Sequence, residues 1–248
     1  MDYINNIIAS IFAIILGQTA NHLCKKLPDW VEEKTTFKQF IDSLKRDFKI
    51  DILYTVIFII LFNCLIIFQV STHNYIAYLY MLCIFSLTII FNIDYRYQLI
   101  PDECHYIVVL CGAINMLCNI TNWSDYLLGA LVGGGSFYLL GLLAIVIYKK
   151  EGMGFGDVKL MASLGLLFGL KNILVITILS FAIGAIISII LIFFRKKQMD
   201  SYIPFGPFIV MATILVMFFK TDIFIEVYFA ICSKIGMFFT DIIFRVIK

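Results

Sequence analysis

The feature that most constrains this 248-residue chain is a series of long apolar runs separated by short polar segments. A helix needs about 20 mostly apolar residues to cross a bilayer. Eight runs are candidates, at roughly 4–23, 51–70, 75–93, 105–121, 127–148, 158–170, 172–194 and 204–219. Only 15% of the residues are charged, against about a quarter in soluble domains. Because lipid offers no hydrogen bonds to a backbone, spanning segments fold as helices. The sequence predicts an all-α, polytopic transmembrane helical bundle of about eight membrane helices.

Two apolar stretches depart from this pattern. The run 158–170 is short for a span and is interpreted as a partial or protein-buried helix that starts at the turn GFGD, residues 154–157. A ninth stretch, 223–245, contains three charged residues, so it either spans the membrane or lies in its interface. Neither alternative is favoured by composition alone.

The basic residues predict an orientation. Lysine and arginine are concentrated in 25–50, 94–104, 149–157 and 195–203, whereas the connections 71–74 and 121–126 contain none. Because cytoplasmic loops are enriched in these residues, the four basic segments are assigned to the cytoplasmic side, with the N-terminus outside. Apolar residues at helical spacing between 37 and 48 also predict a cytoplasmic amphipathic helix on the membrane surface or against other loops.

The cysteines and the net charge give no indication of a metal site or of nucleic-acid binding. The seven cysteines form no CxxC pair and lie mostly inside apolar runs, which is typical of small helix-packing residues and predicts no metal site. The net charge of +2 gives no indication of nucleic-acid binding.

Three aspartates at the ends of apolar runs need an explanation. Asp94 directly follows one run, Asp102 follows a proline before the next, and Asp157 opens the short run after two glycines. An ionised carboxylate close to hydrocarbon is costly, so one found there indicates a functional site. The predicted topology places Asp94 and Asp157 at the same, cytoplasmic, membrane level.

Two carboxylates at one level can perform acid–base chemistry. If they come within a few ångströms, one retains a proton while the other stays ionised. The ionised group can then activate water and the protonated group can polarise a carbonyl, which hydrolyses a peptide without a covalent intermediate. Gly154 and Gly156 are expected to allow positive φ and a close approach of a substrate backbone.

From the sequence alone, each of these aspartates could also have a purely structural role. Asp157 could be a helix N-cap. Asp94 could pair with Arg96 or face water in the loop. Asp102, between a proline and a helix, could also be a cap.

Four ordered segments resemble the bacterial type IV prepilin peptidases, the membrane-embedded GxGD aspartic proteases of the leader peptidase family. ILGQTANHLCKKLP at 15–28 is similar to the signature of their first helix, and FNIDYRYQLIPDE at 91–103 to their aspartate segment. The block from LLGALVGGGSFYLL to GMGFGDVKLMASLGLLFG, within 127–169, is similar to their glycine-rich stretch and GxGD motif. SYIPFGPFI at 201–209 is similar to their Pro-Phe-Gly-Pro motif.

The resemblance implies an activity and a set of site residues. Asp94 and Asp157 would be the catalytic aspartates, with Gly154 and Gly156 forming the active-site loop. The implied reaction removes the basic leader of type IV prepilins or pseudopilins after a glycine, at the cytoplasmic face of the bacterial cell membrane. Substrate-facing or supporting roles are implied for a further set of residues, namely Asp102, Lys159, Pro204, Phe205, Gly206 and Pro207.

One departure from the family pattern affects the cofactors. Many members carry a long cytoplasmic insertion with two CxxC pairs and also methylate the new N-terminus with S-adenosylmethionine. Here the insertion is reduced to 25–50 with Cys24 beside it, so zinc is not expected and methylation is left open. Proteolysis itself would need no cofactor.

The sequence also predicts two domains and leaves a second function open. Residues 1–50 are interpreted as the first transmembrane helix with a short cytoplasmic segment, and 51–248 as the membrane-embedded peptidase domain. The alternative is a small transporter or ion-binding protein with a broken helix at GFGD, which would require a matching interruption elsewhere. The sequence gives no oligomeric state.

Overall fold

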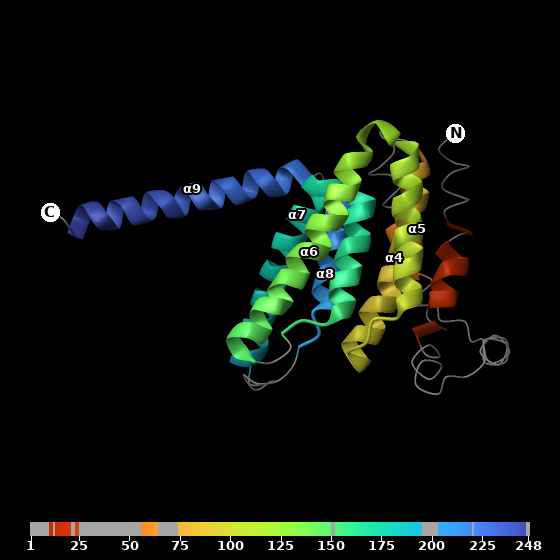
Figure 1. The fold of residues 1–248 in the computed structure, drawn as a ribbon, viewed down its shortest axis with the longest axis horizontal. Helices are drawn as coiled ribbons and strands as arrows, with labels where there is room; N and C mark the ends of the chain where they lie inside the picture. The colour runs from red at the N-terminus through yellow and green to blue at the C-terminus, as the bar shows by residue number, and fades with distance from the viewer. Residues whose placement is uncertain are drawn as a thin grey trace. The chain divides into compact units, whose positions relative to one another are not determined.

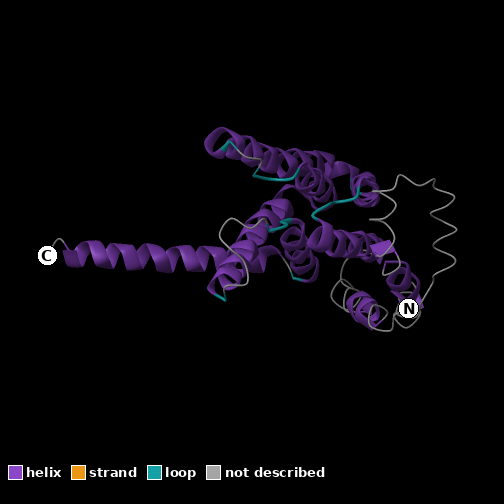
Figure 2. Cartoon of the chain, turned by 90° about the horizontal axis from the view of Figure 1, so that it is seen from below, coloured by secondary structure: helices purple, strands orange, loops and turns teal. Residues whose placement is uncertain are grey.

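A computed structural model describes residues 10–11, 13–20, 23–24, 56–63, 74–149, 152–194, 203–219 and 221–246. The predicted amphipathic helix within 25–50 lies outside these ranges. All regular secondary structure in the described ranges is helical (Figure 2), which confirms the all-α prediction.

Six α-helices and one short 3₁₀ turn have defined bounds. They are α4 (Asn74–Tyr97), α5 (Asp102–Cys118), η1 (Ile120–Asn122), α6 (Trp123–Tyr148), α7 (Phe155–Phe193), α8 (Gly206–Phe218) and α9 (Thr221–Val246) (Figure 1). Among the described residues, three helices are long and apolar enough to cross a membrane, within Tyr75–Tyr97, Ile120–Ile147 and Phe155–Phe193. These helices identify a membrane protein, and the count of about eight membrane helices stays a prediction.

Helix α7 is two helices that fold back on each other at Gly169. Gly169 has φ 76° and ψ 176°, which is not a helical conformation. A Cβ on Gly133 of α6 would lie 2.6 Å from the Met161 carbonyl oxygen and 2.9 Å from Ile173 Cγ1. In a straight helix Met161 and Ile173 would be about 18 Å apart, so the chain must reverse between them. Figure 1 shows the two halves of α7 beside α6.

The half of α7 before the reversal is about 21 Å long, at 1.5 Å per residue, and is thus shorter than the bilayer core. Most of its side chains are buried in the bundle. The helix begins at Phe155, within the GFGD turn. The expectation of a short, protein-buried helix starting at this turn is confirmed, and the turn does not interrupt a helix as the transporter alternative required.

The reversal leaves backbone carbonyls that side-chain amides satisfy. Asn115 Nδ2 of α5 donates to the Leu167 carbonyl at 2.9 Å, and Asn172 Nδ2 donates to the Phe168 carbonyl at 2.7 Å. A helix end buried without such partners would be unstable, so the amides allow α7 to reverse inside the bundle.

Glycines bring α6 and α7 into backbone contact. A Cβ on Gly129 would lie 2.5 Å from the Gly165 carbonyl oxygen, and a Cβ on Gly165 would meet the Gly129 backbone. Small residues of this kind let membrane helices approach closely. They explain why α6 packs more extensively on α7 than any other pair of described helices packs.

Three connections lie at one end of the bundle, and the reversal of α7 brings the third of them there. These are residues 98–101 between α4 and α5, the described residues 149 and 152–154 between α6 and α7, and 203–205 before α8, all at the lower end of the bundle in Figure 1. The first two lie within the basic segments 94–104 and 149–157 that the sequence assigned to one side, and the third begins at the end of the basic segment 195–203. The connection between α5 and α6 lies at the other end.

The C-terminal residues form a separate unit. The chain divides into compact units Met1–Phe218 and Phe219–Lys248. Helix α9 runs through the stretch 223–245, which was predicted to be interrupted by charges. The division into domains 1–50 and 51–248 stays a prediction.

Candidate active site

Asp94 lies in the last turn of α4. The helix ends at Tyr97 because Gln98 adopts φ 55° and its N–H donates back to the Asp94 carbonyl at 2.9 Å. The Asp94 residue is 5% exposed, so it does not face water in the loop. In the described part of the chain no ion pair joins it to Arg96, and both structural alternatives for Asp94 are wrong.

Asp157 lies in the first turn of α7, three residues after the N-cap Gly154. Its own N–H donates to the Gly154 carbonyl at 3.1 Å, and the Gly154 N–H is within hydrogen-bonding reach of its carboxylate. Asp157 is therefore not the N-cap, although its carboxylate reaches back to the capping residue as the acid of a capping box does. The residue is 4% exposed.

The structure brings these two aspartates together. They lie within electrostatic range of each other. Both Asp94 Oδ2 and Asp157 Oδ1 are buried and lack a hydrogen-bond partner among the described residues. Buried polar atoms are nearly always paired, so two unpaired carboxylate oxygens at one place indicate a site that acts on another molecule.

The residue Ile100 joins the two halves of the site. A Cβ on Gly156 would lie 3.1 Å from Ile100 Cβ, and a Cβ on Gly206 would lie 3.4 Å from Ile100 Cδ1. The start of α7 and the start of α8 therefore pack on the same isoleucine side chain. This contact fixes the position of the two helix ends that surround the aspartates.

The Pro-Phe-Gly-Pro segment contacts Asp94 directly. Pro204, Gly206 and Pro207 are buried at the start of α8. A Cβ on Gly206 would lie 2.5 Å from Asp94 Oδ2, and the Gly206 N–H is within hydrogen-bonding reach of the carboxylate. The Phe205 ring packs against Phe181 and Phe208, with ring centroids 5.0 and 5.8 Å apart. The segment is thus anchored by its phenylalanine while its glycine meets the aspartate.

The expected positive φ at Gly154 and Gly156 is wrong. Gly154 has φ −68°, and Gly156 is helical. Among the described glycines only Gly169 has positive φ. At Gly156 a close approach explains the glycine, because Ile100 occupies the space that a side chain would need. At Gly154 a Cβ would make an ordinary contact, 3.5 Å from Asp157 Oδ2.

Asp102 and Lys159 lie together but apart from the buried pair. Lys159 Nζ donates to Asp102 Oδ1 at 2.8 Å, and the two side chains are 41% and 57% exposed. Pro101, not Asp102, is the N-cap of α5, so the capping alternative for Asp102 is also wrong. The Lys159 ammonium also lies 5.4 Å from the centroid of the Phe155 ring.

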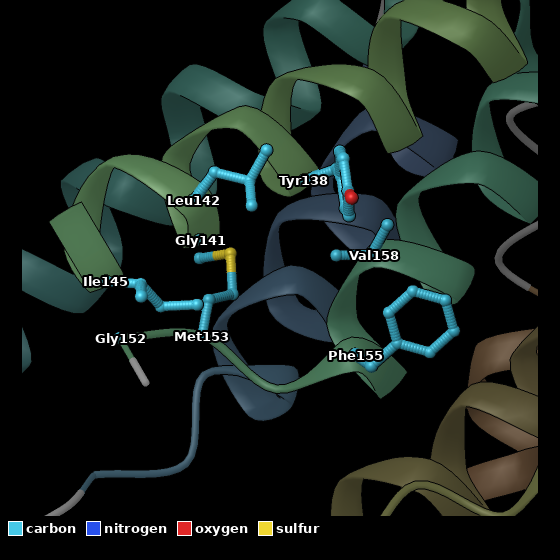
Figure 3. A pocket seen from close by; sticks show the side chains of 8 residues that line it. All are labelled: Tyr138, Gly141, Leu142, Ile145, Gly152, Met153, Phe155 and Val158. Carbon is cyan, nitrogen blue, oxygen red and sulfur yellow. The ribbon is translucent and has the colours of Figure 1, made fainter. Parts of the chain in front are cut away.

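An apolar pocket of about 210 Å³ lies between α6 and the start of α7. In Figure 3 the side chains of Tyr138, Leu142, Met153 and Val158 surround it, with Phe155 at one side. Phe155 and Val158 flank Asp157 in the sequence, so the pocket adjoins the turn that carries this aspartate.

Sequence reasoning missed Ile100 and this pocket. An isoleucine before a proline carries no chemical signal, and the pocket forms only because the segment from Gly152 to Val158 folds back along α6. Among the described residues no group of His, Cys, Asp or Glu is arranged to hold a metal ion.

The part of the chain that contains the site is similar to a known protein family. The model of the "Type IV leader peptidase family" matches residues 79–189, a range that contains both aspartates and the GFGD turn. A prepilin leader peptidase/N-methyltransferase of Xanthomonas campestris is 36% identical over 133 residues, which are 53% of this chain and 46% of the relative. Leader peptidase HopD of Escherichia coli is 32% identical over 131 residues, which are 52% of this chain and 84% of the relative.

The aligned part is limited in length. A prepilin leader peptidase/N-methyltransferase of Pseudomonas aeruginosa is 35% identical over 121 residues, which are 48% of this chain and 42% of the relative. The alignment thus spans less than half of the Xanthomonas and Pseudomonas relatives. No solved structure matches the chain.

Proposed function

The chain belongs to the type IV leader peptidase family, and from this premise and its two buried aspartates we propose that it is an intramembrane aspartic endopeptidase that removes the leader of type IV prepilins or pseudopilins. Family membership confirms the resemblance inferred from the four sequence motifs. The proposed substrates carry a basic leader and are cut after a glycine, as the family resemblance implies.

A single observation carries the proposal. Asp94 and Asp157 are 63 positions apart in sequence but lie within electrostatic range of each other at one end of the bundle, each with a buried carboxylate oxygen that has no partner among the described residues. Two buried carboxylates close together are unfavourable unless they share a proton, and a structural role would pair their oxygens with donors.

The two carboxylates would divide the chemistry. The ionised member takes a proton from a water molecule, and the resulting hydroxide attacks the carbonyl carbon of the scissile peptide. The protonated member donates a hydrogen bond to the carbonyl oxygen as it gains charge. Collapse of the tetrahedral intermediate breaks the C–N bond while a carboxyl group protonates the leaving amine, which leaves a free carboxylate end and a free amino end.

The N–H groups of Gly154 and Gly206 would keep this pair in position. Each lies within hydrogen-bonding reach of one of the two aspartates. A backbone donor fixed by a helix start is preorganised and does not need to reorient during the reaction. Gly206 therefore acts as a positioning residue for Asp94, and Gly154 for Asp157.

The reaction would take place at the cytoplasmic side of a bacterial cell membrane. Two loops around the site lie within basic segments of the sequence, and the third begins at the end of one, which favours that orientation. The apolar pocket of Figure 3 would accept an apolar substrate side chain beside the scissile bond, because it adjoins Asp157 and is lined by Leu142, Met153 and Val158.

The names of the Xanthomonas and Pseudomonas relatives give those proteins an N-methyltransferase activity. In this chain methyl transfer would be a separate activity that uses S-adenosylmethionine. The pocket of Figure 3 does not fit this cofactor, because Tyr138 is its one polar lining side chain. We propose no methyl-transfer step, and mass spectrometry of the mature pilin N-terminus measures this activity independently of cleavage.

Co-expression with a prepilin tests the proposed cleavage. Asp94→Asn and Asp157→Asn should each leave the prepilin unprocessed on an immunoblot, because an amide can neither accept the proton of water nor act as the acid. Asp102→Asn is the matched control: this exposed aspartate binds Lys159, so substantial processing should remain. Near-normal processing by either Asn variant of the buried pair would refute the assignment, and complete loss in Asp102→Asn would assign Asp102 to the catalytic pair.

A further inference from the structure

A second pocket, of about 380 Å³, lies on the outside of the bundle between α5 and α6. Its floor is the first half of α7, through Ala162 and Leu166. Helices α5 and α6 contact each other only sparsely, and Val109 at its edge is 41% exposed. The pocket therefore opens sideways, toward the lipid that surrounds a membrane bundle.

This pocket is on the opposite face of α7 from the aspartate pair. At 100° per residue, Lys159 and Leu166 lie about 200° and 180° around the helix from Asp157. Both residues line the pocket, whereas Asp157 lies on the other side of the helix, within electrostatic range of Asp94. The pocket is thus separate from the proposed catalytic site, although both are at the same membrane level.

The polarity of the pocket changes along its length. The ion pair of Asp102 and Lys159 lies at its cytoplasmic end. His105 and Ser163 line it about one turn deeper, since they follow these residues by three and four positions. Val109 and Leu166 come about one further turn into the bundle. The headgroup layer of a bilayer is about 5–7 Å thick on each side, which is close to one helical turn of about 5.4 Å.

His105 is the polar group that this pocket leaves without a partner. The residue is 5% exposed, and neither Nδ1 nor Nε2 has a hydrogen-bond partner among the described residues. A neutral imidazole carries one donor and one acceptor, and a buried polar group without partners costs free energy. A ligand with an acceptor oxygen at this depth would relieve that cost.

We propose that this pocket binds one diacyl phospholipid. The phosphate meets the Lys159 ammonium at the cytoplasmic end, an ester carbonyl accepts a hydrogen bond from His105 one turn deeper, and an acyl chain lies along Val109, Ala162 and Leu166. The order of charged, hydrogen-bonding and apolar groups in the lipid matches the order of the pocket residues. Lys159 is half-exposed and Asp102 more so, so both remain reachable from the headgroup layer.

Other occupants fit these groups less well. A metal ion would need at least three suitable ligands, and no such group occurs among the described residues. An apolar helix of a substrate would cover the exposed edge at Val109 but brings no phosphate to Lys159 and no free acceptor to His105, because its carbonyls are bonded within the helix.

Native mass spectrometry of the full chain released from nanodiscs tests the proposal. The nanodiscs contain dioleoylphosphatidylglycerol and dioleoylphosphatidylethanolamine, and the measured quantity is the fraction of protein that keeps one lipid after collisional activation. Ala162→Leu fills the floor of the pocket and should reduce the one-lipid fraction by about tenfold. The matched control is Ala185→Leu, which adds the same side chain at an exposed position of α7 that is not among the pocket residues, and it should keep the wild-type fraction.

A second variant covers the case in which Ala162→Leu does not fold. His105→Phe keeps an aromatic ring of similar size but removes both nitrogens, so it should also lower the one-lipid fraction. Wild-type lipid retention in both variants, or no retained lipid in the wild type, would overturn the proposal. Reduced prepilin cleavage by Ala162→Leu with unchanged lipid retention would identify the substrate helix as the occupant and would likewise overturn it. The lipid measurement does not depend on whether the chain cleaves prepilins.

Discussion

Gly206 and Asp94 are in contact at a point where the backbone leaves no room for a side chain. A Cβ at Gly206 would lie 2.5 Å from Asp94 Oδ2 and 3.1 Å from its Cγ. Real Cβ contacts are not this short, so either the aspartate or the start of α8 would have to move. The position of the carboxylate is thus determined as much by a neighbouring glycine as by the helix that carries Asp94.

Gly206→Ala should therefore reduce prepilin cleavage strongly, by about 100-fold, because a displacement of about 1 Å at a reacting group costs this much. Gly135→Ala is the control on α6, since no atom lies within 4 Å of the Cβ that it would add. Cleavage and membrane content of both variants can be measured on immunoblots. Wild-type cleavage by Gly206→Ala would show that the contact does not position Asp94.

At this scale the sequence predicted the two aspartates that the structure brings together but not their surroundings. Asp94 and Asp157 were identifiable because an acid at the end of an apolar run is unusual. Ile100 could not be identified, because its contacts with Gly156 and Gly206 depend on how three segments meet. The sequence also predicted positive φ at the GFGD glycines, which is wrong. Gly156 is helical, and its close packing against Ile100 favours glycine there.

Among the elements, α7 determines the arrangement of the site, because it reverses at Gly169. The apolar pattern separated 158–170 from 172–194, close to the observed break, although it did not indicate the hairpin. The donors that stabilise the break include Asn115 of α5, more than 50 positions away. Such long-range hydrogen bonds cannot be read from local periodicity.

Gly169→Ala should destabilise this reversal. With φ 76° and ψ 176°, Gly169 occupies a region essentially restricted to glycine, and a Cβ would also meet the Asp125 carboxylate. The backbone strain alone costs about 1–3 kcal/mol. We expect a lower Tm for the purified protein and reduced membrane content, whereas Gly135→Ala should match the wild type. An unchanged Tm for Gly169→Ala would contradict the observed backbone conformation.

The pocket between α6 and the start of α7 can be tested by filling it. A Cβ on Gly141 would lie 3.9 Å from the Met153 Cβ, which is an ordinary contact, so Gly141→Leu can fold while its side chain occupies the pocket. We expect a several-fold loss of cleavage with an unchanged Tm. The control Gly135→Leu adds the same side chain to α6 in open space. Equal cleavage by the two variants would exclude the pocket from substrate binding.

For the whole molecule, the central prediction is that the loops of the site face the cytoplasm. Gln98 follows α4 beside the site, whereas Asn122 lies near the opposite end of α5, and both are exposed. In a chain whose native cysteines are replaced, Gln98→Cys should react with a membrane-impermeant thiol reagent only after the cells are opened. Asn122→Cys should react in intact spheroplasts. The reverse pattern would place the site on the outer face.

The charge pattern predicted the grouping of these loops because alternation along the chain is a property of the sequence. It could not show that Asp94 and Asp157 meet, since helices that end at the same level can lie at opposite sides of a bundle. That proximity follows from the packing of α7 and α8 on Ile100.

The most direct test of the account is a double-mutant comparison of cleavage rates with purified protein and a purified prepilin. Groups that act as one unit are strongly non-additive. We predict that Asp94→Asn, Asp157→Asn and the double variant all fall to the same residual rate, with Asp102→Asn close to the wild type. A double variant that loses the product of the two single losses, or a single variant that keeps a substantial rate, would contradict the claim that Asp94 and Asp157 form one catalytic pair.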